Sequence, residues 1–254
     1  MKRNPSKIWS KKEDCRQSES HFVRQPLFEK LVPEELQHKI FDKINEKDYY
    51  INKNDNHYHR KERNVYMNNG EFEQLLGLCC APTLTGLKSA SLVSFQRAKF
   101  QDIYMLLEEY APCFRCKGIA VLSMVENQHH MLVLFYRPAA LSRLLELSGA
   151  RSILKKAGYH LEDTLSEKLE YLRSRILQNC GFPHEIGLFL GYPPADVRGF
   201  IEHKGKDFLY SGYWKVYTNE KAARELFYCY SKCIERFCLN LQRGIPLQEL
   251  LQAV

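Results

Sequence analysis

Several motifs that would assign a function directly are absent from this sequence. It contains no Gly-x-Gly-x-x-Gly fingerprint, no phosphate-binding loop ending in Gly-Lys-Ser/Thr, no Gly-x-Ser-x-Gly elbow and no His-Glu-x-x-His pair. These motifs position nucleotide phosphates, an activated serine and a zinc ion. ATP-driven chemistry, serine hydrolysis and zincin proteolysis therefore have no local support.

Long apolar segments are also missing. The longest apolar run, Ile119 to Val125, has the length of a strand and is far below the roughly 20 residues that span a bilayer. The N-terminus, Met1 to Pro5, lacks the apolar core of a secretory signal. We therefore expect a soluble, cytoplasmic protein with no membrane contact.

Charge of one sign is not concentrated anywhere. The net charge is +7, but residues 71–254 hold 22 Lys/Arg against 19 Asp/Glu, and residues 1–70 hold 15 against 11. Interspersed signs are typical of a solvated surface and not of a nucleic-acid interface. The nine cysteines are odd in number and irregularly spaced, which favours reduced thiols over disulfides.

The chain divides into two regions by composition and apolar periodicity. Residues 1–70 are polar and charged, with helical periodicity only between Pro26 and Ile44, and we interpret them as a partly helical extension. Its tract His57-Tyr58-His59-Arg60 offers metal ligands, although two histidines on a polar loop usually bind nothing specific. Residues 71–254 of this 254-residue chain are rich enough in apolar side chains to form one domain with its own core.

The first half of that domain is predicted to contain strands and helices in the order β-α-β-β-α. The strands are Ala90 to Phe95, 118–125 and 130–136, and the helices are 97–111 and 138–147. The last two strands are apolar on both faces, which is typical of a buried hairpin with helices on both sides. We therefore predict an α+β fold with a small, largely antiparallel sheet.

The second half is predicted to be helical. Asp163 is a candidate N-cap for the helix that follows it. Short helices are expected at 184–190 and from Pro194 onward, and an extended segment at 213–217. A long amphipathic helix is expected from Glu220 to Arg243, with a buried face formed by Ala223, Leu226, Phe227, Tyr230, Ile234, Phe237 and Leu241.

Two signatures carry a family resemblance. The first is Cys80-Ala81-Pro82-Thr83-Leu84 with Gly86-Leu87-Lys88, and the second runs from His184 through Tyr192-Pro193-Pro194 to the segment 214–217. Together with Cys233 and Cys238 near the end, they resemble an uncharacterised bacterial domain-of-unknown-function family that is common in anaerobes. The likeness covers about residues 71–254 and departs from the family in Ser211, where relatives often have a cysteine.

The resemblance implies no established activity and leaves the cofactor unknown. Family members tend to be encoded near flavodoxin-like proteins, which implies a setting in electron transfer or iron physiology and a flavodoxin-like or other redox protein as partner. This inference is by association alone.

Cys80, expected in a loop after a short helix, and His184, expected at a helix start, are the candidate catalytic residues. A cysteine near backbone amides or a cation can become a nucleophilic thiolate, and imidazole titrates near neutrality and can serve as its base. Each residue also has a structural interpretation, since a free cysteine often acts as a small buried hydrophobe and a histidine near a helix start often packs or caps.

Five further residues are candidates for ligand binding: Glu185, Tyr192, Trp214, Lys215 and Tyr217. Trp214 and Tyr217 can supply an apolar wall and Lys215 a polar anchor. One hypothesis is that these residues converge with Cys80 and His184 on one concave surface. The alternative is that they join the helical half to the sheet.

No metal site is predicted. Cys113-Phe114-Arg115-Cys116 has the spacing of zinc knuckles but no second pair completes it. Cys238 points roughly 140° away from Cys233 on a regular helix, so Cys229, Cys233 and Cys238 cannot share one ion.

Three functional hypotheses remain. The first is an accessory module that binds a small redox-active ligand or a protein partner. The second is a thiol-dependent enzyme using Cys80 with His184 as base. The third is a DNA-binding regulator built on the short helices around Gly191 to Pro194, which is disfavoured because Asp196 would repel phosphate.

Overall fold

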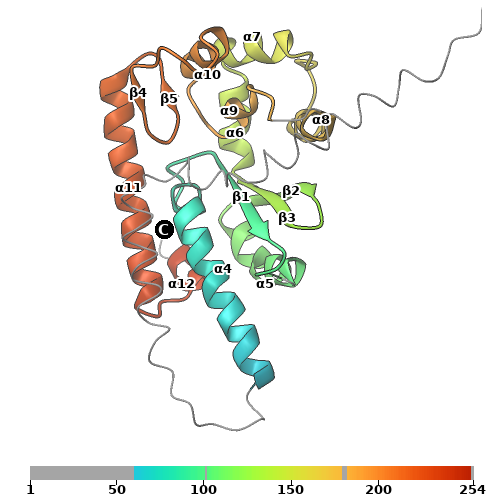
Figure 1. Ribbon diagram of the computed structural model, residues 1–254, viewed down its shortest axis with the longest axis vertical. Coiled ribbons are helices and arrows are strands. Elements are labelled where there is room, and N and C mark those ends of the chain that lie inside the picture. The colour runs from blue at the N-terminus through green and yellow to red at the C-terminus, as the bar shows by residue number, and fades with distance from the viewer. Residues whose placement is uncertain (1–59, 101, 179–181, 253–254) are drawn as a thin grey trace, which may run out of the picture.

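The computed structural model describes residues 60–100, 102–178 and 182–252. The helix expected between Pro26 and Ile44 and the tract His57-Tyr58-His59 lie outside these residues. In chain order the elements (Figure 1) are α4 (Arg60–Leu84), β1 (Ala90–Gln96), α5 (Ile103–Cys116), β2 (Ala120–Glu126), β3 (His130–Tyr136), α6 (Pro138–Leu145), α7 (Ser148–Lys156), α8 (Leu165–Gln178), α9 (Ile186–Phe189), α10 (Pro194–Glu202), β4 (Tyr210–Ser211), β5 (Lys215–Val216), α11 (Glu220–Gln242) and α12 (Leu247–Gln252).

The main sheet has three antiparallel strands in the order β1-β3-β2. The predicted hairpin is confirmed as β2 and β3, and the predicted α+β class with a helical second half is confirmed as well. β3 is the central strand, whereas β2 lies at an edge and carries a register shift between Ser123 and Val125. A separate two-stranded hairpin, β4–β5, pairs Tyr210 with Val216.

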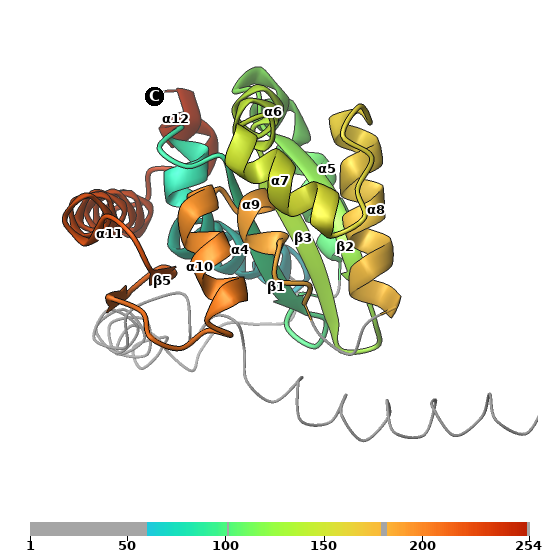
Figure 2. The same cartoon turned by 90° about the horizontal axis from the view of Figure 1, so that it is seen from above.

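Successive residues of β3 face opposite sides of the sheet, as the pleat requires. Met131, Val133 and Phe135 belong to a first core formed with α4, α5, α11 and α12, and Leu134 belongs to a second core formed with α6, α7, α8, α9 and α10. Figure 2 views the molecule from above and shows the helices of the second core on the side of the sheet that faces the viewer. The two helices predicted as covers, now α5 and α6, lie on opposite faces as expected.

The first core depends on the pairing of α4 with α11, which run side by side in Figure 1. Helix α4 crosses residue 70, so one continuous helix spans the predicted boundary between extension and domain. Phe72 and Leu76, just after that boundary, are fully buried. The division of the chain at residue 70 stays a prediction.

The long final helix was predicted well. Nearly the whole predicted apolar face of α11 is buried: Ala223, Phe227, Tyr230, Ile234, Phe237 and Leu241. Asn219 caps this helix by accepting a 3.1 Å hydrogen bond from the Ala222 amide. None of the described helices combines the length and hydrophobicity of a membrane span.

Some predictions of helix bounds and caps were wrong, because tertiary packing or a second sequence motif decided where the helix begins or ends. Cys80 lies inside α4 and not in a loop, because the helix continues through Pro82 to Leu84. Thr164, and not Asp163, caps α8: its hydroxyl accepts from the Glu167 amide, and the Glu167 carboxylate accepts from the Thr164 amide at 2.7 Å. Helices α7 and α12 were not predicted, and α5 begins at Ile103 and not at 97.

Candidate functional site

The C-terminal end of α4 is held by an arginine that sequence reasoning missed. The Arg137 guanidinium donates hydrogen bonds to the carbonyl oxygens of Thr83, Leu84 and Lys117 at 2.7–2.9 Å. The last carbonyls of a helix have no partner within the helix, so this side chain satisfies two of them. The first signature is thereby fixed against the sheet.

The two family signatures meet beside this helix end. Gly191 has a φ of +81°, and a Cβ added there would lie 2.4 Å from Ser89 Oγ and 3.7 Å from Lys88 Cγ. Only glycine allows this close approach without strain. The Lys88 ammonium lies 5.4 Å from the centre of the Tyr192 ring, so residues from both signatures are in contact.

Cys79 and Cys80 lie next to Lys88 in a buried environment. Burial raises the pKa of the Cys79 thiol to about 12, with a further contribution from Cys238, against a smaller opposing effect of the Lys88 charge. Burial, and then the neighbouring Cys79, raise the pKa of Cys80 well above its ordinary value of 9.0, although Lys88 and a hydrogen bond from Ser91 oppose them. Both side chains are therefore protonated thiols at neutral pH.

Tyr192 and Trp214, two predicted ligand-binding residues, stack on each other. Their ring centres are 5.0 Å apart and the planes differ by 28°. The Trp214 indole N–H donates a 2.8 Å hydrogen bond to Asp196 Oδ2. Asp196 Oδ1 accepts from the amides of Tyr217 and Thr218 and from the Thr218 hydroxyl at 2.9–3.1 Å.

This network corrects the expectation for Asp196. Its carboxylate is only 3% exposed and faces inward, so it does not confront solvent or a phosphate as predicted. Asp196 joins the start of α10 to β5 and the segment after it, because a buried carboxylate needs hydrogen-bond donors around it. Its place beside Val197 on the buried face of α10 was the signal that could have revealed this role.

His184 and Lys215 lie on another part of the surface and share Phe200. The exposed His184 ring meets Phe200 edge-on at 5.2 Å. The Lys215 ammonium donates to the Gly205 carbonyl at 2.6 Å and lies 5.9 Å from the Phe200 ring centre. Among the described residues, no hydrogen bond, ion pair or ring contact joins His184 to Cys80, so their convergence on one surface stays a prediction.

Tyr217 packs in a position set by a glycine. Its ring stacks on His203 at 5.5 Å, and a Cβ added to Gly199 would lie 2.4 Å from Tyr217 Cγ. Glycine at 199 therefore lets α10 approach the segment after β5.

Glu185 was predicted as a ligand-binding residue, and in the structure its side chain has two partners in the protein itself. Its carboxylate pairs with Arg175 Nε at 2.6 Å and accepts from the Tyr159 hydroxyl at 3.3 Å. The side chain is 5% exposed and does not cap α9. The ion pair connects α9 to α8 in the second core, so Glu185 is turned away from a solvent-facing ligand site.

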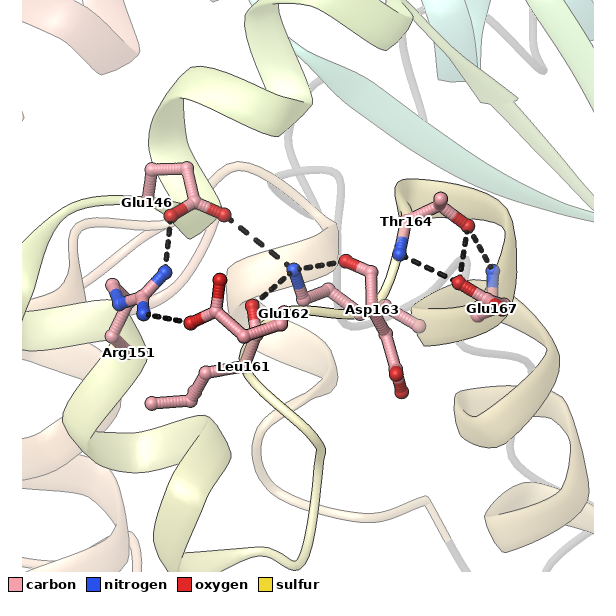
Figure 3. A network of polar contacts seen from close by, with 8 residues as sticks. Glu146, Arg151, Leu161, Glu162, Asp163, Thr164 and Glu167 are labelled. Atoms are coloured by element: carbon pink, nitrogen blue, oxygen red, sulfur yellow. Dashed lines mark hydrogen bonds and ion pairs between the residues drawn. The ribbon is translucent and has the colours of Figure 1, made fainter.

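A second buried lysine occupies a polar network near α8 (Figure 3). The Lys168 ammonium donates to the carbonyl oxygens of Leu161 and Asp163 at 3.0 and 2.6 Å and lies 3.5 Å from Glu146. Arg151 bridges Glu146 to Glu162 on the outside of the same network. These contacts hold the loop before α8 against the end of α6.

An aromatic groove lies between the β4–β5 hairpin and α11. It encloses about 270 Å³ and is lined by Tyr210, Gly212, Tyr213, Arg224, Phe227, Tyr228 and Ser231. The Arg224 guanidinium lies 3.7 Å from the centre of the Tyr210 ring and is held by Glu220 at 2.8 Å. Sequence reasoning missed this groove because its two walls come from separate elements.

The described residues contain no group of three or more His, Cys, Asp or Glu side chains placed to hold a metal ion. Seven cysteines of this part of the chain are free: Cys79, Cys80, Cys113, Cys116, Cys229, Cys233 and Cys238.

Comparison with known families assigns the chain. A family model described as "Protein of unknown function (DUF3793)" matches residues 76–251. The chain belongs to this family. The match covers every candidate residue of both signatures and the aromatic groove. Searches of curated proteins and of solved structures found no match. The predicted membership in a domain-of-unknown-function family is thereby confirmed, and the family brings no activity with it.

Proposed function

We propose that this DUF3793 protein is a binding module that holds a planar, negatively charged, redox-active group in the aromatic groove. The observation that carries the proposal is the groove itself, where four aromatic side chains and one arginine surround a preformed depression. Ligand sites are typically concave and apolar with few polar anchors. The groove has this composition.

The groove offers both stacking and charge. Tyr228 is 64% exposed at the rim, where the Lys232 ammonium lies 5.9 Å from its ring centre. Stacking of a ligand on this ring would contribute about 0.5–1.5 kcal/mol beyond the buried area. Arg224 lies over Tyr210 and presents a cation to the same space. Guanidinium groups suit phosphate and carboxylate because their N–H donors form a planar fork.

The walls of the groove are fixed before any ligand arrives. The Tyr213 hydroxyl lies 3.2 Å from Ser231 Oγ and ties the hairpin to α11. Phe227 packs so closely on the hairpin that a Cβ at Gly212 would lie 2.4 Å from its ring. Trp214, predicted as a ligand wall, packs edge-on against Phe227 at 4.5 Å. Preorganisation reduces the entropic cost of binding.

The size of the groove favours a ligand whose ring system lies in the groove while its other groups lie outside. Its 270 Å³ is just below the range of about 300–1,000 Å³ for sites that enclose a whole ligand. A flavin, free or presented by a flavodoxin-like partner, has the required planarity, phosphate charge and redox activity. We place this role in the cytoplasm, and the free thiols of the described chain support that placement.

The alternative of a thiol-dependent enzyme is favoured less. Such an enzyme needs a thiolate and a base within hydrogen-bond reach, whereas Cys80 is fully buried with a raised pKa and His184 packs on Phe200. DNA binding is also favoured less, because α9 spans only Ile186–Phe189 and gives the first helix of a helix-turn-helix about one turn.

Titration with flavin mononucleotide, followed by quenching of flavin fluorescence, tests the proposal. We expect saturable binding by the wild-type chain and about tenfold weaker binding by Tyr228→Ala, since one stacking contact is lost. The matched control is Tyr104→Ala, which removes a tyrosine that is 51% exposed on α5, remote in sequence from the groove. Absence of saturable binding, or equal weakening by both variants, contradicts the proposal.

A further inference from the structure

The end of α5 carries a pair of cysteines that belongs to neither signature. Cys113 and Cys116 are free thiols in the last turn of this helix, three residues apart. Residues at this spacing lie on one face of a helix, with Cβ atoms about 5–6 Å apart. A disulfide needs about 3.5–4.5 Å between its Cβ atoms. A tightening of the turn by about 1–2 Å is therefore enough to join the two sulfurs.

The two thiols differ in accessibility. Cys116 is exposed, so a small molecule in solution can reach its sulfur. Cys113 is partly buried and packs against the first core. An accessible thiol with a shielded thiol beside it suits a reaction in two steps, in which the first sulfur forms a mixed disulfide and the second resolves it.

The last turn of α5 is able to tighten because its hydrogen bonding is already interrupted. Pro112 lies inside the helix directly before Cys113, and a proline offers no amide hydrogen to the carbonyl four residues earlier. Gly118, just after the helix, has a φ of +65°, and a Cβ added there would meet nothing within 4 Å apart from its chain neighbours. The turn therefore has open space at its end.

A second pair of cysteines provides the contrast. Cys229 and Cys233 of α11 also combine one exposed thiol with one partly buried thiol. They are four residues apart in the interior of a 23-residue helix, and the Cys233 sulfur lies 3.3 Å from the Thr85 hydroxyl. Drawing these sulfurs together would distort helical hydrogen bonds on both sides of the pair. The position at a helix end thus distinguishes the pair on α5 from the pair on α11.

We propose that Cys113 and Cys116 form a thiol–disulfide exchange site that is oxidised by a small disulfide such as glutathione disulfide. The Cys116 thiolate attacks one sulfur of the small disulfide, so that a mixed disulfide forms and one thiol leaves. The Cys113 thiolate then attacks the Cys116 sulfur, so that the internal disulfide forms and the second thiol leaves. The protons of the two cysteines pass to the two leaving groups. The protein is oxidised by two electrons, and the small disulfide is reduced to two thiols.

Equilibration with glutathione tests the proposal on the full-length chain. The protein is held in mixtures of reduced and oxidised glutathione and quenched with acid. Free thiols are blocked with N-ethylmaleimide, and disulfides are located by peptide mass mapping. We expect the internal bond to be the main oxidised form of Cys113 and Cys116. We expect Cys229 to carry glutathione instead, with at least about tenfold less internal bond to Cys233.

Two variants give matched controls. Cys113→Ser keeps the exposed thiol without its partner and should accumulate glutathione on Cys116. Cys233→Ser makes the same change on α11 and should leave oxidation of the first pair unchanged. If a variant does not fold, the products on the two pairs of the wild-type chain still decide. A lasting glutathione adduct on wild-type Cys116, equal internal bonds in both pairs, or an internal bond that forms only in urea overturns the proposal.

The proposal is independent of the aromatic groove, because none of the residues that line the groove belongs to α5. Loss of flavin binding by Tyr228→Ala would therefore leave the exchange site untouched, and absence of the internal disulfide would not bear on the groove.

Discussion

Two lysines of this protein, one buried and one partly buried, lie in opposite kinds of surroundings. Lys168, in the network of Figure 3, is 5% exposed and its ammonium meets two backbone carbonyls and a carboxylate. Lys88, where the two signatures meet, has thiols and an aromatic ring around it and no described anionic partner. One site stabilises the charge of lysine, and the other favours the loss of that charge.

The difference decides whether the side chain adds to stability or reduces it. A satisfied ammonium closes a loop and adds stability, whereas an unsatisfied one costs stability. Two buried carboxylates resemble Lys168, because Asp196 accepts hydrogen bonds at both oxygens and Glu185 Oε1 accepts from Arg175 and Tyr159. Among these four groups, only Lys88 lacks such compensation.

The largest expected effect is a loss of stability when the Lys168 ammonium is removed. Replacing it by methionine (Lys168→Met) removes the donor to the part-buried carbonyls of Leu161 and Asp163. We expect the free energy of unfolding, measured by urea titration, to fall by about 2–4 kcal/mol. The control is Lys156→Met on exposed α7. A fall below about 1 kcal/mol would show that Lys168 is not structural.

The next effect concerns the thiols beside Lys88. Cys79 and Cys80 are protonated thiols, and Cys80 is buried while Cys79 is partly buried. Iodoacetamide at pH 8 should therefore alkylate exposed Cys116 and Cys229 about a hundredfold faster than Cys80. Mass mapping over time measures the rates, and the same reaction in urea should equalise them. Rapid alkylation of Cys80 in the folded chain would mean that Lys88 activates it, and would restore the thiol-enzyme hypothesis.

The smallest effect is on the stability contribution of Lys88. Its pKa is about 8 in the folded chain and near 10.5 when unfolded, so folding below pH 8 requires burial of a charge. Lys88→Met should therefore raise the free energy of unfolding by about 1–2 kcal/mol at pH 7.

That gain should disappear as pH rises from 8 towards 10.5, where the amine is neutral in both states. Urea titrations at pH 7 and pH 10 measure the difference in the free energy of unfolding between the variant and the wild type. The titration of other groups largely cancels in this difference. A gain that is the same at both pH values would mean that the Lys88 charge is not the cause.

Much of the fold could be predicted because it depends on short-range patterns. The continuous apolar run across 130–136 predicted a strand buried on both faces, and the spacing from Ala223 to Leu241 predicted the buried face of α11. The capping box Thr164–Glu167 was also present in the sequence, and choosing Asp163 overlooked the glutamate three residues after the threonine.

The sites could be predicted only in part. The signatures identified Tyr192 and Trp214, which do meet, but not the partner that each polar side chain finds. Glu185 pairs with Arg175 from a different helix, and the aromatic groove joins Tyr210 of the hairpin to Arg224 of α11. Such contacts join segments that no local periodicity relates.

By itself the sequence determined the strands of the main sheet, the buried face of the last long helix and the family to which the chain belongs, since these follow from local spacing and motifs. Only the tertiary structure decided which charges are compensated. Lys88 and Lys168 are the same residue type, and both lie close to helix ends in the chain. Their opposite properties arise from dielectric surroundings and hydrogen-bond partners that assemble only when distant segments pack together.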